Sequence, residues 1–308
     1  GERKVTKFHF IQNRKVALII LAAVFLVGIL SFIIRGFNID IDFSGGTEIQ
    51  LGLGQTVTPE ICDDINAIIE AELGHEYVSS TTQSTADEDI AIIRTGTKAL
   101  EPAQQDKLLD AISAKYEKAD IGNKQITVVK PTIGTSLTKK GLLAVGIAVV
   151  LMLIYIWFRF DLASGIAAVC SLVHDLFVMM TVYSLLQIPI NSNIIAALLT
   201  ILGYSINATI IIFDRIRENK VKMGDAPFGE VVNKGIHETL GRSINTTLTT
   251  LFTIGMVYIL GVESIRNFAL PLIVGIVAGL FSSVFVSGML WEALSHVIKP
   301  REKKKASK

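Results

Sequence analysis

The chain has 308 residues, of which half are hydrophobic and only 19% are charged, and its mean hydropathy is +0.51. This composition argues against a water-soluble globular protein and favours an integral membrane protein. The net charge is only +1, so the positions of the charges are more informative than their sum, and no nucleic-acid partner is expected.

Six apolar stretches are each long enough to cross a bilayer, which takes roughly 20 residues for a hydrocarbon core of ~30 Å. They are residues 16–34, 141–158, 162–186, 192–213, 243–262 and 268–294. The first stretch is longer than the apolar region of a signal peptide and lacks a small-x-small cleavage pattern, so we predict that it is retained. The chain begins with glycine instead of methionine, as expected of a processed, trimmed or excised piece.

Lys and Arg residues in short connections mark the cytoplasmic side of a membrane protein. They are concentrated before the first span, in the loop predicted after the fourth span and in the tail, whereas residues 187–191 contain none and residues 263–267 contain only Arg266. We therefore predict six transmembrane helices with both termini in the cytoplasm. The predicted segments are 1–35 (N-terminus and first span), 36–137 (extracytoplasmic domain), 138–298 (spans two to six) and 299–308 (basic cytoplasmic tail).

Residues 36–137 read as a soluble α+β domain. Ile49, Leu51 and Leu53 alternate as in a half-buried strand. Thr58 and Pro59 are typical of a helix start, because they supply a capping hydroxyl and a proline at the first position. We predict further strands at 76–83, 88–94 and 124–130, a turn at 84–87 and a second helix at 102–118. This β-α-β-β-α-β order is that of a ferredoxin-like sandwich, and it favours a binding or force-transmitting module over an enzyme.

Polar side chains recur on one helical face in three of the spans. They are Ser171, His174 and Asp175 in the third span, Thr200, Tyr204 and Asn207 in the fourth, and Arg242, Asn245, Thr246, Thr249, Thr250 and Thr253 in the fifth. Such groups usually face a bundle interior or a water path, because they cost free energy in lipid. For the individual threonines we favour the structural interpretation that they hold helices together by interhelical hydrogen bonds.

Asp175 is the main candidate for a proton or ion site, with His174 beside it. It lies ~20 Å from the inner end of its span at a rise of ~1.5 Å per residue. A charge there costs ~2.5–3.5 kcal/mol, which protonation would remove. We expect Arg242 either to bias a nearby acid or water chain or to extend its charge to the inner boundary. A direct pair between Asp175 and Arg242 is not expected, because their predicted depths differ.

Three further patterns bear on packing and binding. Gly275 and Gly279 form a GxxxG pattern, which allows two helices to approach closely. Residues 303–305 are lysines that either contact anionic lipid headgroups or merely anchor the inner end. Cys62 is predicted outside and Cys170 inside a span, so no disulfide is expected, and no metal or cofactor site is evident. We find no nucleotide-binding loop or nucleophile–base pair and predict that the protein is not an enzyme.

Five spaced motifs together resemble the SecF family, and the resemblance covers essentially the whole chain. The motifs are Asp42-Phe43-Ser44-Gly45-Gly46-Thr47, Val173-His174-Asp175, Gly203-Tyr204-Ser205-Ile206-Asn207, Phe213-Asp214-Arg215-Ile216-Arg217-Glu218-Asn219 and Arg242-Ser243-Ile244-Asn245-Thr246. Members of this family are the smaller halves of the SecD–SecF accessory complexes of bacterial protein export and belong to the RND superfamily.

The resemblance implies a SecD-like partner, separate or fused, and the SecYEG channel with a translocating unfolded polypeptide. It further implies that proton motive force or sodium drives late translocation steps outside the bacterial cytoplasmic membrane. Asn207 and Arg242 match relay positions of the family, and Tyr204, Asn245, Thr246, Thr249 and Thr250 are expected to support them.

The chain departs from the family pattern at Ala208, where the family commonly has an aspartate. Alanine cannot bind or release a proton. Either Asp175 or a SecD carboxylate carries the ion, or this lineage couples differently, or the position was substituted; we favour the first. An RND-type exporter of small molecules or lipids and a passive translocon scaffold are the alternative functions. The single modest outer domain argues against the exporter, whereas Ala208 keeps the scaffold open.

Overall fold

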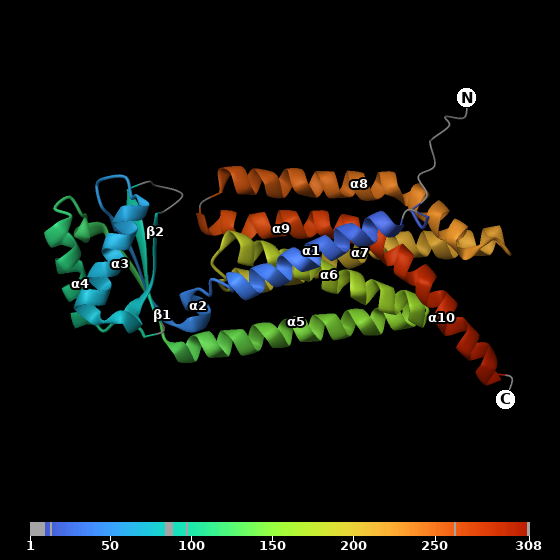
Figure 1. Ribbon diagram of the computed structural model, residues 1–308, viewed down its shortest axis with the longest axis horizontal. Coiled ribbons are helices and arrows are strands. Elements are labelled where there is room, and N and C mark those ends of the chain that lie inside the picture. The colour runs from blue at the N-terminus through green and yellow to red at the C-terminus, as the bar shows by residue number, and fades with distance from the viewer. Residues whose placement is uncertain (1–9, 13, 84–88, 97, 262, 307–308) are drawn as a thin grey trace, which may run out of the picture.

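The computed structural model describes residues 10–12, 14–83, 89–96, 98–261 and 263–306. The turn predicted at 84–87 lies outside these residues. A long helical bundle and a small α/β domain lie end to end (Figure 1). The start of α1 and the end of α10 lie at the end of the bundle remote from the sheet (Figure 1).

Six stretches of helix in the described chain are long and apolar enough to cross a membrane, as predicted. The helices are α1 (Arg14–Ile34), α5 (Pro131–Arg159), α6 (Leu162–Leu186), α7 (Asn193–Met223), α8 (Phe228–Leu260) and α9 (Glu263–Phe281), which continues through the π-helical segment η3 (Ser282–Ser287) into α10 (Gly288–Ala306). Beyond η3, α10 turns away from the direction of α9 (Figure 1). The protein is therefore a multi-pass membrane protein.

The loop predicted after the fourth span is wrong, because α7 and α8 both continue past their apolar parts and are joined only by residues 224–227. Charged side chains join the two helical extensions. Arg215 Nε donates to Glu238 Oε2 at 2.7 Å, and Asn219 Nδ2 donates to the same oxygen at 2.6 Å. Gly224, at a φ of +55°, then ends α7. Charged residues thus end the apolar run without ending the helix.

The GxxxG pattern brings α9 close to α7 within this chain. A Cβ atom at Gly275 would overlap the side chain of Ile201, and one at Gly279 would lie 3.2 Å from Cβ of Ser205. Only glycine leaves room for this approach, as expected of small residues at membrane helix contacts. Ser205 therefore lies against the last spanning helix.

The α/β domain contains four strands and two longer helices in the described residues. In chain order they are β1 (Gly46–Gly52), α3 (Pro59–Leu73), β2 (Val78–Gln83), β3 (Ile90–Thr95), α4 (Pro102–Lys115) and β4 (Gln125–Val129). The strands pair antiparallel in the order β2-β3-β1-β4. The strand predicted from residue 76 begins at Val78, because a short 3₁₀ turn occupies residues 75–77.

One face of this sheet forms the domain core, and the other face is turned toward the bundle (Figure 1). Buried side chains from β1, α3 and α4 fill the core, including Ile49, Leu51, Ile65, Leu108 and Ile112. The predicted helix start is confirmed, because Thr58 Oγ1 accepts the backbone N–H of Ile61 and Pro59 is the first residue of α3.

Candidate functional site

Asp175 lies at a buried meeting point of three helical segments. Its side chain, on α6, is 0% exposed. Oδ2 accepts hydrogen bonds from the Ser205 hydroxyl of α7 and, at 2.8 Å, from the Ser282 hydroxyl of η3. Oδ1 lies 2.9 Å from Nδ1 of His174, whose ring is also buried. Both carboxylate oxygens therefore have polar partners in the bundle interior.

The π-helical segment η3 positions the Ser282 hydroxyl beside Asp175. π-helical turns inside α-helices are rare and often occur at functional sites, because they displace side chains from regular helical spacing. Ser282 contacts Asp175, and the next residue, Ser283, places its hydroxyl 2.9 Å from Thr209 Oγ1 of α7. A serine hydroxyl can both donate and accept, so these contacts can adjust to a carboxylate or to a carboxylic acid.

The remaining relay candidates lie apart from Asp175 on an exposed face of α7 and α8. This polar face consists of Asn207, Arg242, Asn245, Thr246 and Thr249, all exposed in the chain alone. Its two helices are joined by Tyr204 Oη, which donates to Thr247 Oγ1 at 3.1 Å. The sequence-predicted residues thus form two groups, the buried pair His174 and Asp175 and the exposed polar face beside half-buried Ala208.

The threonines predicted on the polar face of the fifth span bond within their own helix. The hydroxyl of Thr246 donates to the carbonyl of Arg242 at 3.0 Å, and those of Thr249 and Thr250 donate to the carbonyl of Thr246 at 2.9 and 3.0 Å. The expected bonds from these hydroxyls to other helices are not among the contacts of the described residues. These bonds satisfy the hydroxyl donors and so lower the free-energy cost of exposing them to lipid. They do not bind another helix of this chain to the polar face.

Sequence reasoning missed Ser205 and Ser282 as partners of Asp175. Ser205 lies inside the motif that runs from Gly203 to Asn207, but it points away from Asn207 and was not on the predicted face. Ser282 and Ser283 form a pair of adjacent hydroxyls in an apolar span. This pair is the signal in the sequence for a polar site in the last span. The direction in which the Ser282 side chain points, however, depends on the π-helical turn.

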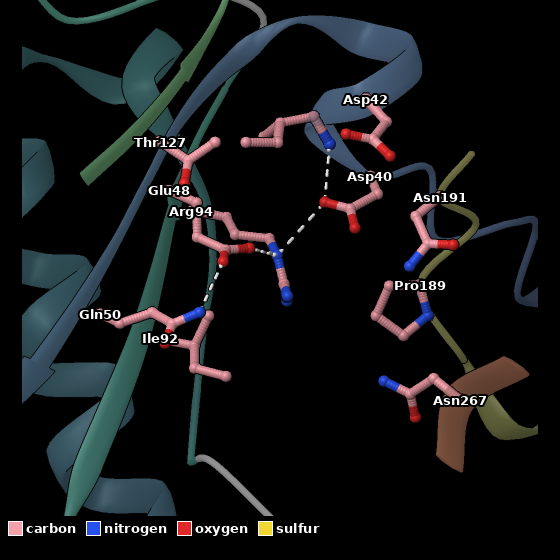
Figure 2. Close-up of a pocket in the computed structure, with 11 residues that line it drawn as sticks. Asp40, Asp42, Glu48, Gln50, Ile92, Arg94, Thr127, Pro189, Asn191 and Asn267 are labelled. Atoms are coloured by element: carbon pink, nitrogen blue, oxygen red, sulfur yellow. Dashed lines mark hydrogen bonds and ion pairs between the residues drawn. The ribbon is translucent and has the colours of Figure 1, made fainter. Parts of the chain in front are cut away.

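A second polar site lies between the sheet and the bundle. Figure 2 shows Arg94 of β3 between Glu48 of β1 and Asp40 of the segment before the sheet, in a cavity that Asn191 and Asn267 line from the bundle side. Nε of Arg94 lies 2.8 Å from Glu48 Oε2 and 3.3 Å from Asp40 Oδ1. All three side chains are mostly buried.

Burial raises the pKa of Asp40 above its usual value of 3.8, while Arg94 opposes this rise and nearby Glu48 and Asp42 add to it. A carboxyl with a raised pKa in the folded protein favours folding when protonated. Asp40 therefore contributes to the stability of the folded protein below pH 3.8, and this contribution is lost as the pH rises through the raised pKa of its carboxyl.

We therefore expect Asp40→Asn, which cannot ionise but keeps an acceptor for the Ile41 N–H, to gain stability relative to wild type as pH rises. Thermal unfolding of both proteins in detergent, from about pH 4 to about pH 8, measures this difference. A difference that stays constant across that range contradicts the prediction.

Comparison with known proteins connects this architecture with protein export. Residues 109–297 match the family described as protein export membrane protein SecD/SecF, C-terminal. The chain is 35% identical over 288 residues to the protein translocase subunit SecF of Acidaminococcus fermentans, covering 92% of this chain and 96% of the relative.

Fused relatives are similar over part of their length. The protein translocase subunit SecDF of Bacillus subtilis is 33% identical over 98% of this chain, and the match covers 39% of SecDF. The crystal structure of SecDF from Thermus thermophilus, described as a translocon-associated membrane protein, has a TM-score of 0.79 at 32% identity, covering 94% of this chain and 39% of that one. This chain belongs to the SecD/SecF family of protein-export membrane proteins.

Proposed function

We propose that this protein is a membrane subunit of the Sec translocase that works with a SecD-like partner, separate or fused. In this proposal an ion gradient of protons or sodium drives late steps of polypeptide translocation on the outer side of the bacterial cytoplasmic membrane. The SecF and SecDF relatives support the export role. Under this proposal the SecYEG channel and the unfolded polypeptide are the other partners.

The observation that carries ion coupling is Asp175, a carboxylate shared by three helical segments. Protonation changes its charge where Ser205 and Ser282 meet it, so it changes the preferred arrangement of α6, α7 and η3. Moving one charge across 100 mV supplies about 2.3 kcal/mol, which is enough to shift a two-state equilibrium between helix positions.

The exposed polar face of α7 and α8 supports the proposal that a SecD-like partner packs against this chain. Arg242 and Asn207 are exposed in the chain alone, and Arg242 lines the same surface cavity as Ile211 of α7. Polar groups at membrane depth are stable when they face protein or water and costly when they face lipid. A second set of membrane helices that covers this face would shelter them, and a carboxylate on that partner would replace the acid absent at Ala208.

The α/β domain supports action on the outer side. Its element order and its strand order β2-β3-β1-β4 support assignment as a ferredoxin-like sandwich. It lies at the end of the bundle remote from the start of α1 and the end of α10 (Figure 1). With both termini in the cytoplasm, as we propose, the domain would therefore lie outside. The lysines at 303–305 would then lie near anionic lipid on the inner side.

Reconstitution tests the proposed function directly. We expect proteoliposomes that contain SecYEG, the SecD-like partner and this protein to complete translocation of an arrested preprotein faster when a proton or sodium gradient is imposed. Vesicles without this protein, and vesicles whose gradient is collapsed by an ionophore, are the controls. The proposal fails if completion is independent of both gradients.

A passive scaffold is the second candidate function. Two observations favour it: Ala208 cannot titrate, and the partners of Asp175 are of the kind that also stabilise a purely structural carboxylate. In this case the protein would speed the completion of translocation in the same proteoliposomes, and by the same factor with and without a gradient.

A further inference from the structure

The segment that leads from α1 to the sheet is fastened to the bundle. This connector, residues 35–45, includes the short helix α2 (Ile41–Ser44). The backbone N–H of Asp40 donates to the carbonyl of Ile190 at 3.1 Å, and the N–H of Ile190 donates to the carbonyl of Asn38 at 2.8 Å. Because residue 190 lies between α6 and α7, the connector is held to these two spanning helices.

The covalent link between the connector and the sheet is a pair of glycines. Gly45 and Gly46 have φ values of +75° and +134°, a region that residues with a side chain rarely adopt. A Cβ atom at Gly46 would also lie 2.6 Å from the carbonyl oxygen of Gly96. A second covalent link is Lys130, which alone separates β4 from α5. Because the sheet joins the bundle only through these two short links within the described residues, contacts beside them help to fix the angle of the sheet to the bundle.

Arg94 makes such a contact. It lies directly opposite Glu48 in the antiparallel pairing of β3 with β1. Glu48 is in turn held by Gln50, whose Nε2 donates to Glu48 Oε1 at 3.0 Å. The sheet thus presents Arg94 in a fixed position toward Asp40 of the connector (Figure 2).

The contact is shielded from water, which strengthens its electrostatics. The side chains of Arg94, Asp40 and Glu48 are 13%, 10% and 15% exposed. The guanidinium of Arg94 compensates the negative charges of Asp40 and Glu48 in this buried site. Without it, the two carboxylates repel each other and lack solvation. Removing one partner from a buried ion pair is costly for this reason.

We propose that Asp40, Arg94 and Glu48 form a latch that holds the α/β domain in one orientation on the bundle, and that loss of Arg94 lets the domain tilt about its two links, Gly45–Gly46 and Lys130. Arg94 is then a positioning residue. The latch deepens the proposed function, because release of the domain would be the outer movement that ion coupling drives. The orientation itself is measurable without any export activity.

Spin-label distances in the full-length chain, reconstituted in lipid nanodiscs, test the latch. Labels at His75→Cys in the domain and Leu260→Cys at the end of α8, both exposed, report the orientation after Cys62→Ser and Cys170→Ser remove the native thiols. Arg94→Gln should raise the population of displaced distances at least about tenfold, as expected for loss of one charge-assisted contact.

A matched control and a double variant separate the latch from general damage. Lys115→Gln breaks an exposed 2.8 Å ion pair with Asp64 in the same domain and should leave the distances unchanged. Asp40→Asn combined with Arg94→Gln removes the repulsion between carboxylates but also lacks the ion pair that joins the sheet to the connector, so its displaced population should stay above that of wild type. A distribution equal to wild type in Arg94→Gln or in this double variant overturns the latch.

If Arg94→Gln does not fold, Arg94→Lys replaces it. Lysine keeps the charge but lacks the Nε–H that lies between both carboxylates, so the displaced population should rise in the same direction by a smaller factor. An unchanged distribution in that variant overturns the latch. If the Arg94 variants show displaced distances but a gradient has no effect on translocation by the wild-type protein, the latch is supported and the proposed function is contradicted.

Discussion

Asp175→Asn is expected to abolish the gradient-dependent part of preprotein translocation and to leave the gradient-independent part intact. Asparagine has nearly the same shape, and its oxygen can still accept the hydroxyl of Ser282, so the helices keep their packing. It cannot bind or release a proton or carry the charge that attracts a cation. Rates of completed translocation in energised and non-energised proteoliposomes measure this loss.

Two variants control for structural damage at Asp175. Asp64→Asn removes a carboxylate from the exposed surface of the α/β domain and should retain full stimulation. Ser282→Ala keeps Asp175 ionisable but removes one hydrogen-bond donor, so stimulation should fall only in part. Wild-type stimulation in Asp175→Asn would show that the carboxylate is structural, and the passive scaffold would then be the better explanation.

Gly275→Leu is expected to destabilise the folded bundle by about 1–3 kcal/mol or more, because the added side chain has no room between α9 and α7. Its Cβ alone would overlap Ile201. The change also pushes α9 away from α7, and with it Ser282 of η3, which contacts Asp175. Thermal unfolding in detergent should show a clear decrease in the midpoint, together with lower gradient-dependent translocation.

Gly146→Leu is the matched control for Gly275→Leu. It introduces the same side chain into the α5 span, where none of the described residues, apart from the adjacent backbone of α5 itself, comes within 4 Å of the added Cβ, so stability should be unchanged or slightly higher. If both leucine variants unfold at the same temperature, close contact of α9 with α7 does not limit the stability of the bundle.

The amino-acid sequence alone determined the features that depend on neighbouring residues. Runs of apolar residues gave the six spanning stretches, and the limits of α6 agree with the prediction of residues 162–186. Thr58 and Pro59 marked the start of α3, because a helix cap is a local hydrogen bond. Asp175 could be selected from the sequence, because a charge in the middle of an apolar run is costly in any membrane fold.

The tertiary structure alone decided which residues from distant parts of the chain meet. Ser205 and Ser282 reach Asp175 across 30 and 107 positions of sequence, and the direction of Ser282 depends on a π-helical turn that apolar periodicity does not reveal. Arg94 and Asp40 likewise meet only when the sheet rests on the bundle. Hydropathy and capping report the surroundings of one segment, whereas these sites depend on how several segments pack against one another.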